Sequence, residues 1–229
     1  MFLSVNNRSH MINIENIDCM IRLKEAPDNY WDLAVVDPPY GLTKGMDKRN
    51  QIPKNSNVNS INDNLYSKVS QWNKAPDKSY FDELKRVSKN WIVWGGNYFP
   101  SLWVEPSRGF IFWDKMQFSK LHADGELAQT SFDRNCKLFR YRSCGNHLGT
   151  GQMGKRIHPT QKPIPLYIWI LNNYANHGDR ILETHLGSGS IAIACHDMGF
   201  HLDGYELDEE YYNAAMKRLK NHQRQLKLF

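Results

Sequence analysis

The feature that most constrains the fold is a short apolar run that stops at two prolines. The run is Leu33-Ala34-Val35-Val36, and Asp37-Pro38-Pro39 follows it directly. Four consecutive apolar residues, two of them β-branched, predict a strand of a parallel sheet that is buried on both faces. Neither proline can continue a hydrogen-bonded strand or helix, so the strand must end there.

Further strands and helices alternate along the chain. Short β-branched and aromatic runs predict strands at 11–14, 91–94, 110–113, 180–183 and 201–206, with extended structure between 126 and 141. Apolar spacing, prolines and glycine turns predict helices at 18–26, 77–89, 164–175, 190–198 and 208–225. This alternation is typical of an α/β fold with a doubly wound, mostly parallel sheet, and we predict one Rossmann-like domain over residues 1–229.

Composition excludes several classes of protein. The chain of 229 residues is 41% hydrophobic and 23% charged, which is ordinary for a globular domain. No apolar run approaches the length of a membrane span, and the N-terminus lacks the pattern of a signal peptide. The four cysteines form no C-x-x-C pair, and no Cys/His group has zinc spacing. We expect an intracellular protein with no membrane part and no metal site.

Positive charge is concentrated in one part of the chain. Residues 108–156 hold nine Lys/Arg and four Asp/Glu residues, which accounts for the whole formal net charge of +5. After Arg134, no acidic residue occurs up to Arg156. A nucleic-acid backbone would be attracted to such a surface, but a solvated basic face without a partner fits the charge equally well.

Residues 41–76 show no strand or helix pattern. Asparagines are interspersed there with Lys, Gly, Ser and Pro. This composition predicts a surface loop that is mobile in the absence of a ligand.

The end of the buried strand carries residues suited to activating an amine. Ligands of open α/β sheets bind at the C-terminal ends of strands, and there the sequence has Asp37-Pro38-Pro39-Tyr40. A carboxylate and a backbone carbonyl that accept both hydrogens of an aromatic amine would draw the nitrogen towards tetrahedral geometry. They would also stabilise the positive charge that develops as the amine attacks. Tyr40 could stack on a base taken out of a nucleic-acid helix.

A glycine-rich turn follows the strand at 180–183. The segment reads Leu182-Glu183-Thr184-His185-Leu186-Gly187-Ser188-Gly189-Ser190. Glycines allow close approach of the backbone to a ligand, and the N–H groups of the following helix point at it. Glu206 ends the next strand, where such folds place an acid that binds ribose hydroxyls. The two features together predict a site for a cofactor that contains adenosine.

A third segment precedes the helix at 164–175. It is polar and carries two prolines, and it reads Ile157-His158-Pro159-Thr160-Gln161-Lys162-Pro163. A helix start with Thr160 or Gln161 as the cap would explain this segment by itself.

In combination and in this order, the three segments resemble the amino-methyltransferases of DNA, in the permuted subgroup called beta. The resemblance extends from about Asp18 to Tyr212. It implies transfer of a methyl group from S-adenosylmethionine (SAM) to the N6 amine of adenine in a short DNA sequence. The implied catalytic residues are Asp37, Pro38, Pro39 and Tyr40.

The resemblance also implies a set of cofactor-binding residues. Within this set, Glu206 would bind the ribose, while Thr160, Gln161 and Lys162 would close over the methionine end. The full set is Asp18, Asp37, Thr160, Gln161, Lys162, Glu183, His185, Gly187, Ser188, Gly189, Ser190 and Glu206.

Two departures from the family pattern stand out. The usual D-P-F is Glu183-Thr184-His185 here, which keeps a carboxylate but lengthens it, and we interpret His185 as a packing or hydrogen-bonding substitute. The chain is also short for the subgroup, so DNA recognition is expected from the loop 41–76 and from an inserted region at about 115–156. The expected DNA-binding residues are Lys115, Arg134, Lys137, Arg140, Arg142, Lys155 and Arg156.

Compact enzymes of this kind are similar to those of phages and prophages, often without a partner nuclease. We expect a methylase of the restriction-modification type, with or without a partner nuclease, in the cytoplasm of a bacterial or phage-infected cell. A homodimer is possible, because relatives are often dimers.

Several alternatives stay open. N4-methylation of cytosine uses the same chemistry, although serine usually replaces the first aspartate in cytosine enzymes, so Asp37 favours adenine. An RNA or protein methyltransferase would have the motifs in the opposite order. A dinucleotide-dependent oxidoreductase would need a final glycine where Ala192 stands. A DNA-binding module without activity is compatible with the altered turn at 183–185, although the intact Asp37 and Tyr40 argue against it.

Overall fold

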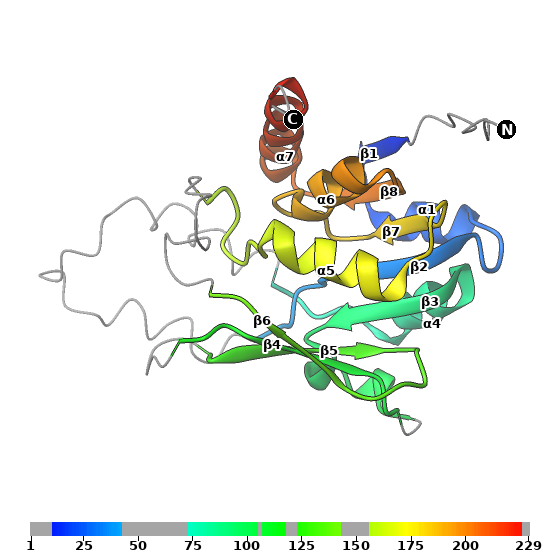
Figure 1. The fold of residues 1–229 in the computed structure, drawn as a ribbon. Coiled ribbons are helices and arrows are strands. Elements are labelled where there is room, and N and C mark those ends of the chain that lie inside the picture. Colours follow the sequence, from blue (N-terminus) through cyan, green and yellow to red (C-terminus); the bar gives the residue numbers. More distant parts are fainter. Residues whose placement is uncertain (1–10, 43–72, 105–106, 118–122, 143–155, 226–229) are drawn as a thin grey trace, which may run out of the picture.

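The computed structural model describes residues 11–42, 73–104, 107–117, 123–142 and 156–225. These residues form a single eight-stranded sheet with helices on both of its faces (Figure 1). The strands are β1 (Ile12–Asn16), β2 (Trp31–Val36), β3 (Ser88–Trp94), β4 (Phe110–Asp114), β5 (Gly125–Thr130), β6 (Lys137–Arg140), β7 (Arg180–Glu183) and β8 (His201–Glu206). The helices are α1 (Cys19–Glu25), α4 (Lys78–Val87), α5 (Ile164–Tyr174), α6 (Ser190–Met198) and α7 (Glu209–Arg224), with two 3-10 turns, η2 (Gly96–Tyr98) and η3 (Pro100–Leu102).

The strand order is β1-β8-β7-β2-β3-β5-β4-β6. The first five strands of this order are parallel, β5 is antiparallel to both β3 and β4, and β6 is parallel to β4. The predicted α/β class with a mostly parallel sheet is therefore confirmed. Strands β2 and β7 are neighbours near the middle of the sheet, although β7 comes much later in the chain.

Two apolar cores lie on opposite faces of the sheet, and β2 contributes to both. Leu33 and Val35 belong to one core, while Ala34 and Val36 belong to the other. Successive side chains of a strand point to opposite faces, so a strand between two helical layers must be apolar throughout. This is why the continuous apolar run correctly predicted a central strand.

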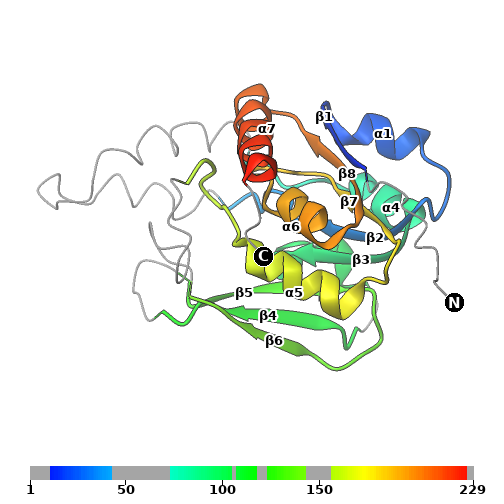
Figure 2. The ribbon, with the colours of Figure 1, turned by 45° about the horizontal axis from the view of Figure 1, so that its top comes forward.

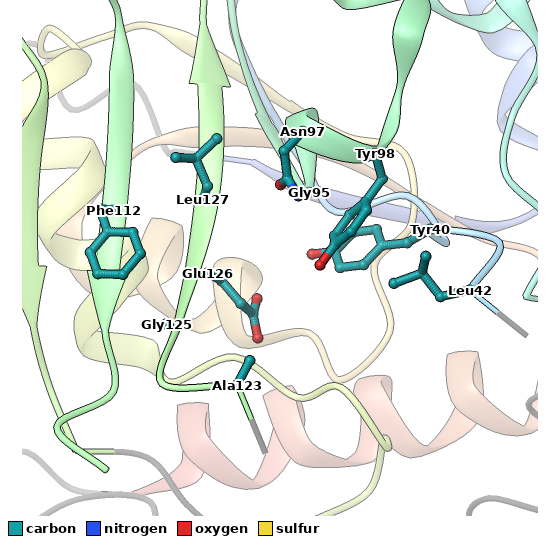
Figure 3. A pocket seen from close by; sticks show the side chains of 10 residues that line it. All are labelled: Tyr40, Leu42, Gly95, Asn97, Tyr98, Phe112, Ala123, Gly125, Glu126 and Leu127. Atoms are coloured by element: carbon teal, nitrogen blue, oxygen red, sulfur yellow. The ribbon is translucent and has the colours of Figure 1, made fainter. Parts of the chain in front are cut away.

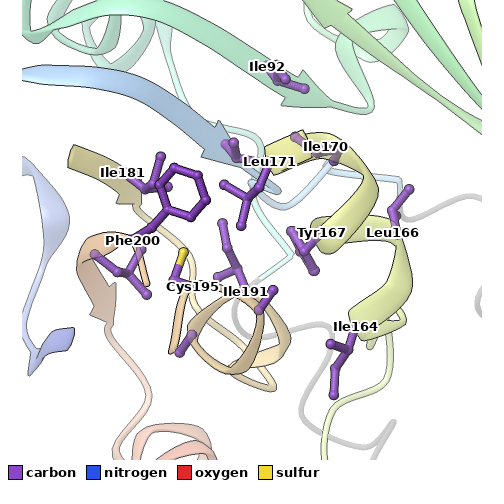
Figure 4. Packing of buried hydrophobic residues seen from close by; sticks show 14 of the residues in the cluster. Ile92, Ile164, Leu166, Tyr167, Ile170, Leu171, Ile181, Ile191, Cys195 and Phe200 are labelled. Atoms are coloured by element: carbon purple, nitrogen blue, oxygen red, sulfur yellow. The ribbon is translucent and has the colours of Figure 1, made fainter. Parts of the chain in front are cut away.

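Helices α5, α6 and α7 cover one face, and α1 and α4 cover the other (Figure 2). The core beneath α5 and α6 contains Ile170 and Leu171 packed towards Ile181 and Ile191 (Figure 4). These side chains are almost fully buried. The helices are therefore fixed against the sheet by apolar contact, and the loops between them are held at its edge.

The boundary predicted between one helix and the strand after it is wrong. The helix expected at 77–89 ends at Val87, because Ser88 already pairs with Trp31 as the first residue of β3. Asp77 caps this helix as expected, since its carboxylate accepts hydrogen bonds from Ser79 N and Tyr80 N.

Of the predicted mobile loop 41–76, residues 43–72 lie outside the described residues. In the region 115–156, the described residues include β5 and β6, which are strands of the main sheet. In the described part of the chain, no helix combines the length and the apolar character needed to cross a bilayer.

Asp32 connects three central strands at the edge opposite the glycine turn. One of its carboxylate oxygens accepts from Arg180 N at 2.9 Å, and the other lies 2.6 Å from Lys89 Nζ. Burial alone would raise the pKa of Asp32, but the Arg180 N–H and the Lys89 ammonium outweigh it and lower this pKa. The ionised carboxylate thus links β2 to β7 and β3.

We predict that Asp32→Asn lowers the free energy of unfolding by about 1–3 kcal/mol at pH 7, since hydrogen bonds to a charged group are lost. Because the pKa of Asp32 is lowered in the folded state, this contribution is present above about pH 4 and is lost as the pH falls through the folded pKa. Urea titrations should show a smaller loss of stability in this variant at pH 3 than at pH 7. Asp133→Asn, at an exposed ion pair with Arg108, is the control and should have little effect at either pH.

Candidate active site

The C-terminal ends of β2 and β7 lie side by side, and they bring two predicted motifs together. Leu33 pairs with Ile181 and Ala34 with Leu182, so the residues after both strands emerge at the same edge of the sheet. Asp37 directly follows β2, and the glycine turn directly follows β7. Ligands of open parallel sheets bind at this edge.

Both carboxylate oxygens of Asp37 are engaged. Oδ1 accepts a hydrogen bond from the Tyr40 hydroxyl at 2.8 Å, and Oδ2 lies 2.6 Å from Lys162 Nζ. The side chain of Asp37 is 14% exposed. Burial raises the pKa of Asp37, and the Lys162 ammonium opposes this rise. An acceptor carboxylate therefore lies at the predicted catalytic position, held by two neighbours.

Tyr40 is held in place by aromatic rings and by a glycine. Its ring stacks on Tyr98 with a centroid distance of 5.1 Å, and Phe99 contacts it edge-on at 6.1 Å. Gly95 has φ +66°, and a Cβ at this position would lie 2.2 Å from the Tyr40 ring. A side chain at Gly95 would thus displace Tyr40.

A cavity of about 360 Å³ opens beside Tyr40 (Figure 3). In Figure 3 the Glu126 carboxylate lies between Phe112 on one side and the Tyr40–Tyr98 pair on the other. Aromatic walls with a few polar groups suit a planar heteroaromatic ring, and the volume is within the range of ligand pockets. The lining residues are Tyr40, Leu42, Gly95, Asn97, Tyr98, Phe112, Ala123, Gly125, Glu126 and Leu127.

Lys162 connects Asp37 to this cavity. Its ammonium lies 2.6 Å from Asp37 Oδ2 and 3.1 Å from Glu126 Oε2, and its side chain is 3% exposed. Burial alone would lower the pKa of Lys162, but the two carboxylates outweigh it and raise this pKa. Lys162 was predicted to close over the methionine end of the cofactor, and in the structure its ammonium contacts the Asp37 carboxylate.

Glu126 is a site residue that the sequence did not reveal. Besides Lys162, its carboxylate contacts the Lys115 ammonium. Burial alone would raise the pKa of Glu126, but the Lys162 and Lys115 ammonium groups lower it to about 2. The only local signal was an acid within an extended, otherwise uncharged run, and it gave no hint of the partners. Lys115, expected on the DNA-binding surface, lies beside the cavity.

The glycine turn and Glu206 form a connected unit. Gly187 and Gly189 have φ values of +54° and +68°, and Ser190 begins α6. Gly187 N donates to Glu206 Oε2 at 2.7 Å, and Asp208 N donates to Oε1 at 3.0 Å. Burial raises the pKa of Glu206. The predicted ribose acid and the predicted glycine turn are thus adjacent at the ends of β8 and β7, with Ser188 buried between the two glycines.

The altered triplet after β7 is tightly packed. Glu183 is 1% exposed, and its Oε1 accepts from His185 N at 3.1 Å. Burial raises the pKa of Glu183 well above its usual value. Thr184 Oγ1 lies 2.6 Å from the Tyr80 hydroxyl and 2.9 Å from His185 Nδ1. Burial lowers the pKa of His185 to about 4, so the ring is neutral at pH 7, and its contacts agree with a packing and hydrogen-bonding role.

Three other predicted cofactor residues lie at the same edge in different roles. Asp18 is exposed and caps α1, accepting from Met20 N at 2.9 Å, just after β1 has paired with β8. Thr160 is exposed and contacts His158 Nδ1 at 3.2 Å. Gln161 is buried, and its Oε1 accepts from Ile157 N at 3.1 Å. The contacts of Thr160 and Gln161 organise the segment before Lys162.

The predicted DNA-binding residues have different surroundings in the described part of the chain. Lys137 and Arg140 are exposed on edge strand β6, where Arg140 pairs with Asp114 at 3.2 Å. Arg134 packs on Phe132 and Tyr174 and donates to Asn173 O, at the end of α5 remote from Lys162. Arg142 is exposed, Arg156 is half-buried, and Lys155 lies outside the described residues.

Comparison with known proteins gives a partial match to one family. Residues 122–217 match the N6/N4 DNA methylase family. This span contains Glu126, Lys162, the glycine turn and Glu206, and it confirms the predicted resemblance at the level of these DNA methylases. The beta subgroup and a phage origin stay predictions.

The chain is also similar to individual DNA methyltransferases. Type II methyltransferase M.HpaI of Haemophilus parainfluenzae is 25% identical over 236 residues, which cover 86% of this chain and 70% of its own length. The crystal structure of the M1.HpyAVI–SAM complex has a TM-score of 0.56 at 19% identity, covering 91% of this chain and 99% of its own. PvuII DNA methyltransferase, which is cytosine-N4-specific, has a TM-score of 0.58 at 11% identity, covering 96% and 89%. These structures share the fold of this chain.

We predict that Gly95→Ala lowers the free energy of unfolding by about 1–3 kcal/mol more than Gly199→Ala, because the Tyr40 ring must move. Gly199 is the matched control, since its φ is +74° but open space surrounds the position of a Cβ. Urea denaturation of both variants measures the difference. Equal losses would show that the Tyr40 ring tolerates a methyl group at Gly95.

Proposed function

We propose that this protein transfers a methyl group from SAM to the N6 amine of adenine in DNA. The observation that carries the proposal is the position of Asp37. Its buried carboxylate lies beside an aromatic cavity and at the same sheet edge as the Gly187–Glu206 unit. A base in the cavity and a cofactor at the glycine turn would meet at Asp37.

The residues at the ends of β7 and β8 fit a cofactor that contains adenosine. Glu206 offers acceptor oxygens for ribose hydroxyls, and the positive φ values of Gly187 and Gly189 bring backbone close to the site. Glu183 is a buried acid at the end of the adjacent strand, suited to the ammonium group of a methionine moiety. When bound, SAM supplies an electrophilic methyl group on a sulfonium centre.

Asp37 and Pro38 would activate the target amine. A carboxylate oxygen and the Pro38 carbonyl accept the two amine hydrogens, which makes the nitrogen lone pair available for attack. Asp37 also stabilises the positive charge that forms on the nitrogen and can take the surplus proton, or pass it to water. Pro39 keeps the Pro38 carbonyl in a fixed direction. Tyr40 presents its ring to the base.

Adenine is the proposed base, and cytosine is the second candidate. Asp37 at the first motif position favours adenine by resemblance. The shared fold of the cytosine-N4-specific PvuII enzyme keeps N4-methylation of cytosine open. Both bases present an amine next to a ring nitrogen, so the same groups could act on either.

DNA is the proposed partner, and the exposed Lys137 and Arg142 are candidates for phosphate contacts. We propose the bacterial or phage-infected cytoplasm as the place of action. A homodimer remains part of this proposal.

Asp37→Ala is predicted to abolish methyl transfer, by a factor of about a thousand or more, because the amine loses its main acceptor. The assay incubates protein with SAM and unmethylated DNA, digests the DNA and identifies methylated nucleosides by mass spectrometry. N6-methyladenine with the wild type supports the proposal, and N4-methylcytosine would reassign the base. Full activity of Asp37→Ala would refute the assigned role of Asp37, and calorimetry should show that this variant still binds SAM.

Glu206→Gln is predicted to weaken SAM binding by about 10–100-fold, because hydrogen bonds to a charged acceptor are lost. Isothermal calorimetry measures the dissociation constant. Glu209→Gln, at an exposed acid three residues later, is the matched control and should leave it unchanged. Unchanged affinity in Glu206→Gln would exclude a ribose contact.

A further inference from the structure

Four buried or half-buried charged side chains form a row of ion pairs that leads from Asp37 to the cavity. Asp37 pairs with Lys162, Lys162 also pairs with Glu126, and Glu126 also pairs with Lys115. Two carboxylates and two ammonium groups balance each other. Lys162 is shared between its carboxylates, while Lys115 contacts Glu126.

The contacts of Asp37 in this structure weaken it as an acceptor for the target amine of the proposed reaction. Both of its carboxylate oxygens are already engaged, one by Tyr40 and the other by Lys162. The target amine needs an acceptor on Asp37. Each carboxylate oxygen can accept a second hydrogen bond, but the Lys162 ammonium 2.6 Å from Oδ2 weakens this oxygen as an acceptor, so partial release of Lys162 would strengthen the contact with the amine. An ammonium group that is 3% exposed cannot give up its partner without another one nearby, since an unpaired buried charge is very costly.

We propose that Glu126 is a positioning residue for methyl transfer, and that it receives the Lys162 ammonium when the target amine takes its place on Asp37. This inference rests on the proposed function. Glu126 Oε2 lies 3.1 Å from Lys162 Nζ, so a small movement of the ammonium suffices. Among the described residues, no group donates a well-aligned hydrogen bond to this oxygen, which leaves it ready to accept one.

Lys115 holds the Glu126 carboxylate in position beside Lys162. Its ammonium contacts the other oxygen, Oε1, so Glu126 stays ionised and its Oε2 stays directed at Lys162. The Glu126 carboxylate also lines the cavity beside Tyr40. A base that enters the cavity therefore arrives beside the carboxylate towards which the Lys162 ammonium moves.

Glu126→Gln tests this role. Without the second carboxylate, Lys162 stays on Asp37, and kcat for methyl transfer is expected to fall by about 10–100-fold while the SAM dissociation constant is unchanged. The acid limb of the kcat profile should also move to lower pH, because loss of a nearby negative charge favours the ionised form of Asp37. A loosened fold would not shift the profile in this direction. The ionisable groups that face Asp37 are Lys162, Tyr40, Glu126, Glu183, Tyr80 and Tyr167.

In Glu126→Gln the Lys115 ammonium also loses its partner, and this loss could by itself slow methyl transfer. A double variant distinguishes this effect from the proposed role of Glu126. Lys115→Met with Glu126→Gln removes one charge of each sign, and the proposal expects it to stay as slow as Glu126→Gln. Recovery of the wild-type rate in the double variant would overturn the proposal, as would an unchanged kcat in Glu126→Gln. Glu126→Asp keeps a carboxylate and should retain more activity than the glutamine variant. Glu25→Gln, at an exposed acid of α1, controls for the substitution itself.

The wild type in the same assay separates the two proposals. If the wild type transfers no methyl group to DNA, the proposed function fails. If the wild type is active and the Glu126 variants behave like it, only the role of Glu126 fails.

Discussion

The parallel pairing of β2 with β7 is the constraint on which the rest of the site depends. It places the ends of two strands that are far apart in the chain at one edge of the sheet. Asp37 and Tyr40 follow β2, while Glu183 ends β7 and the glycine turn comes shortly after it. Apolar cores on both faces hold the pair in position, so the edge is a rigid place for chemistry. The chain order of the motifs matters little once the strands are neighbours.

The second constraint is charge balance in a buried place. In the proposed reaction Asp37 must be ionised to accept an amine, yet burial opposes its ionisation. The Lys162 ammonium lies 2.6 Å from the Asp37 carboxylate and favours its ionised form. The same ammonium also contacts the Glu126 carboxylate. The segment 157–163 thus contacts the acid that is proposed to activate the amine, through Lys162, and it also lies beside the glycine turn, through His158.

The sequence pointed to residues at the ends of strands, and it could not show contacts that cross between distant elements. Asp37, Tyr40, Gly187 and Glu206 could be found because each follows a strand with a clear apolar pattern. Glu126 could not be found, because its importance comes from ammonium groups at positions 115 and 162. The basic residues were predicted as one surface from their closeness in sequence. Strand β6 separates Arg134 from Arg142, since an extended strand carries its two ends apart.

The sequence by itself determined which strand is central, where it ends and which residue types stand at its end, because apolar periodicity and proline act locally. It also carried enough of the family pattern for the match over residues 122–217. Only the tertiary structure decided that the Lys162 ammonium contacts the Asp37 carboxylate and that Glu126 is its second partner. Ion pairs between distant segments depend on distances of a few ångströms, and the packing of the whole sheet sets those distances.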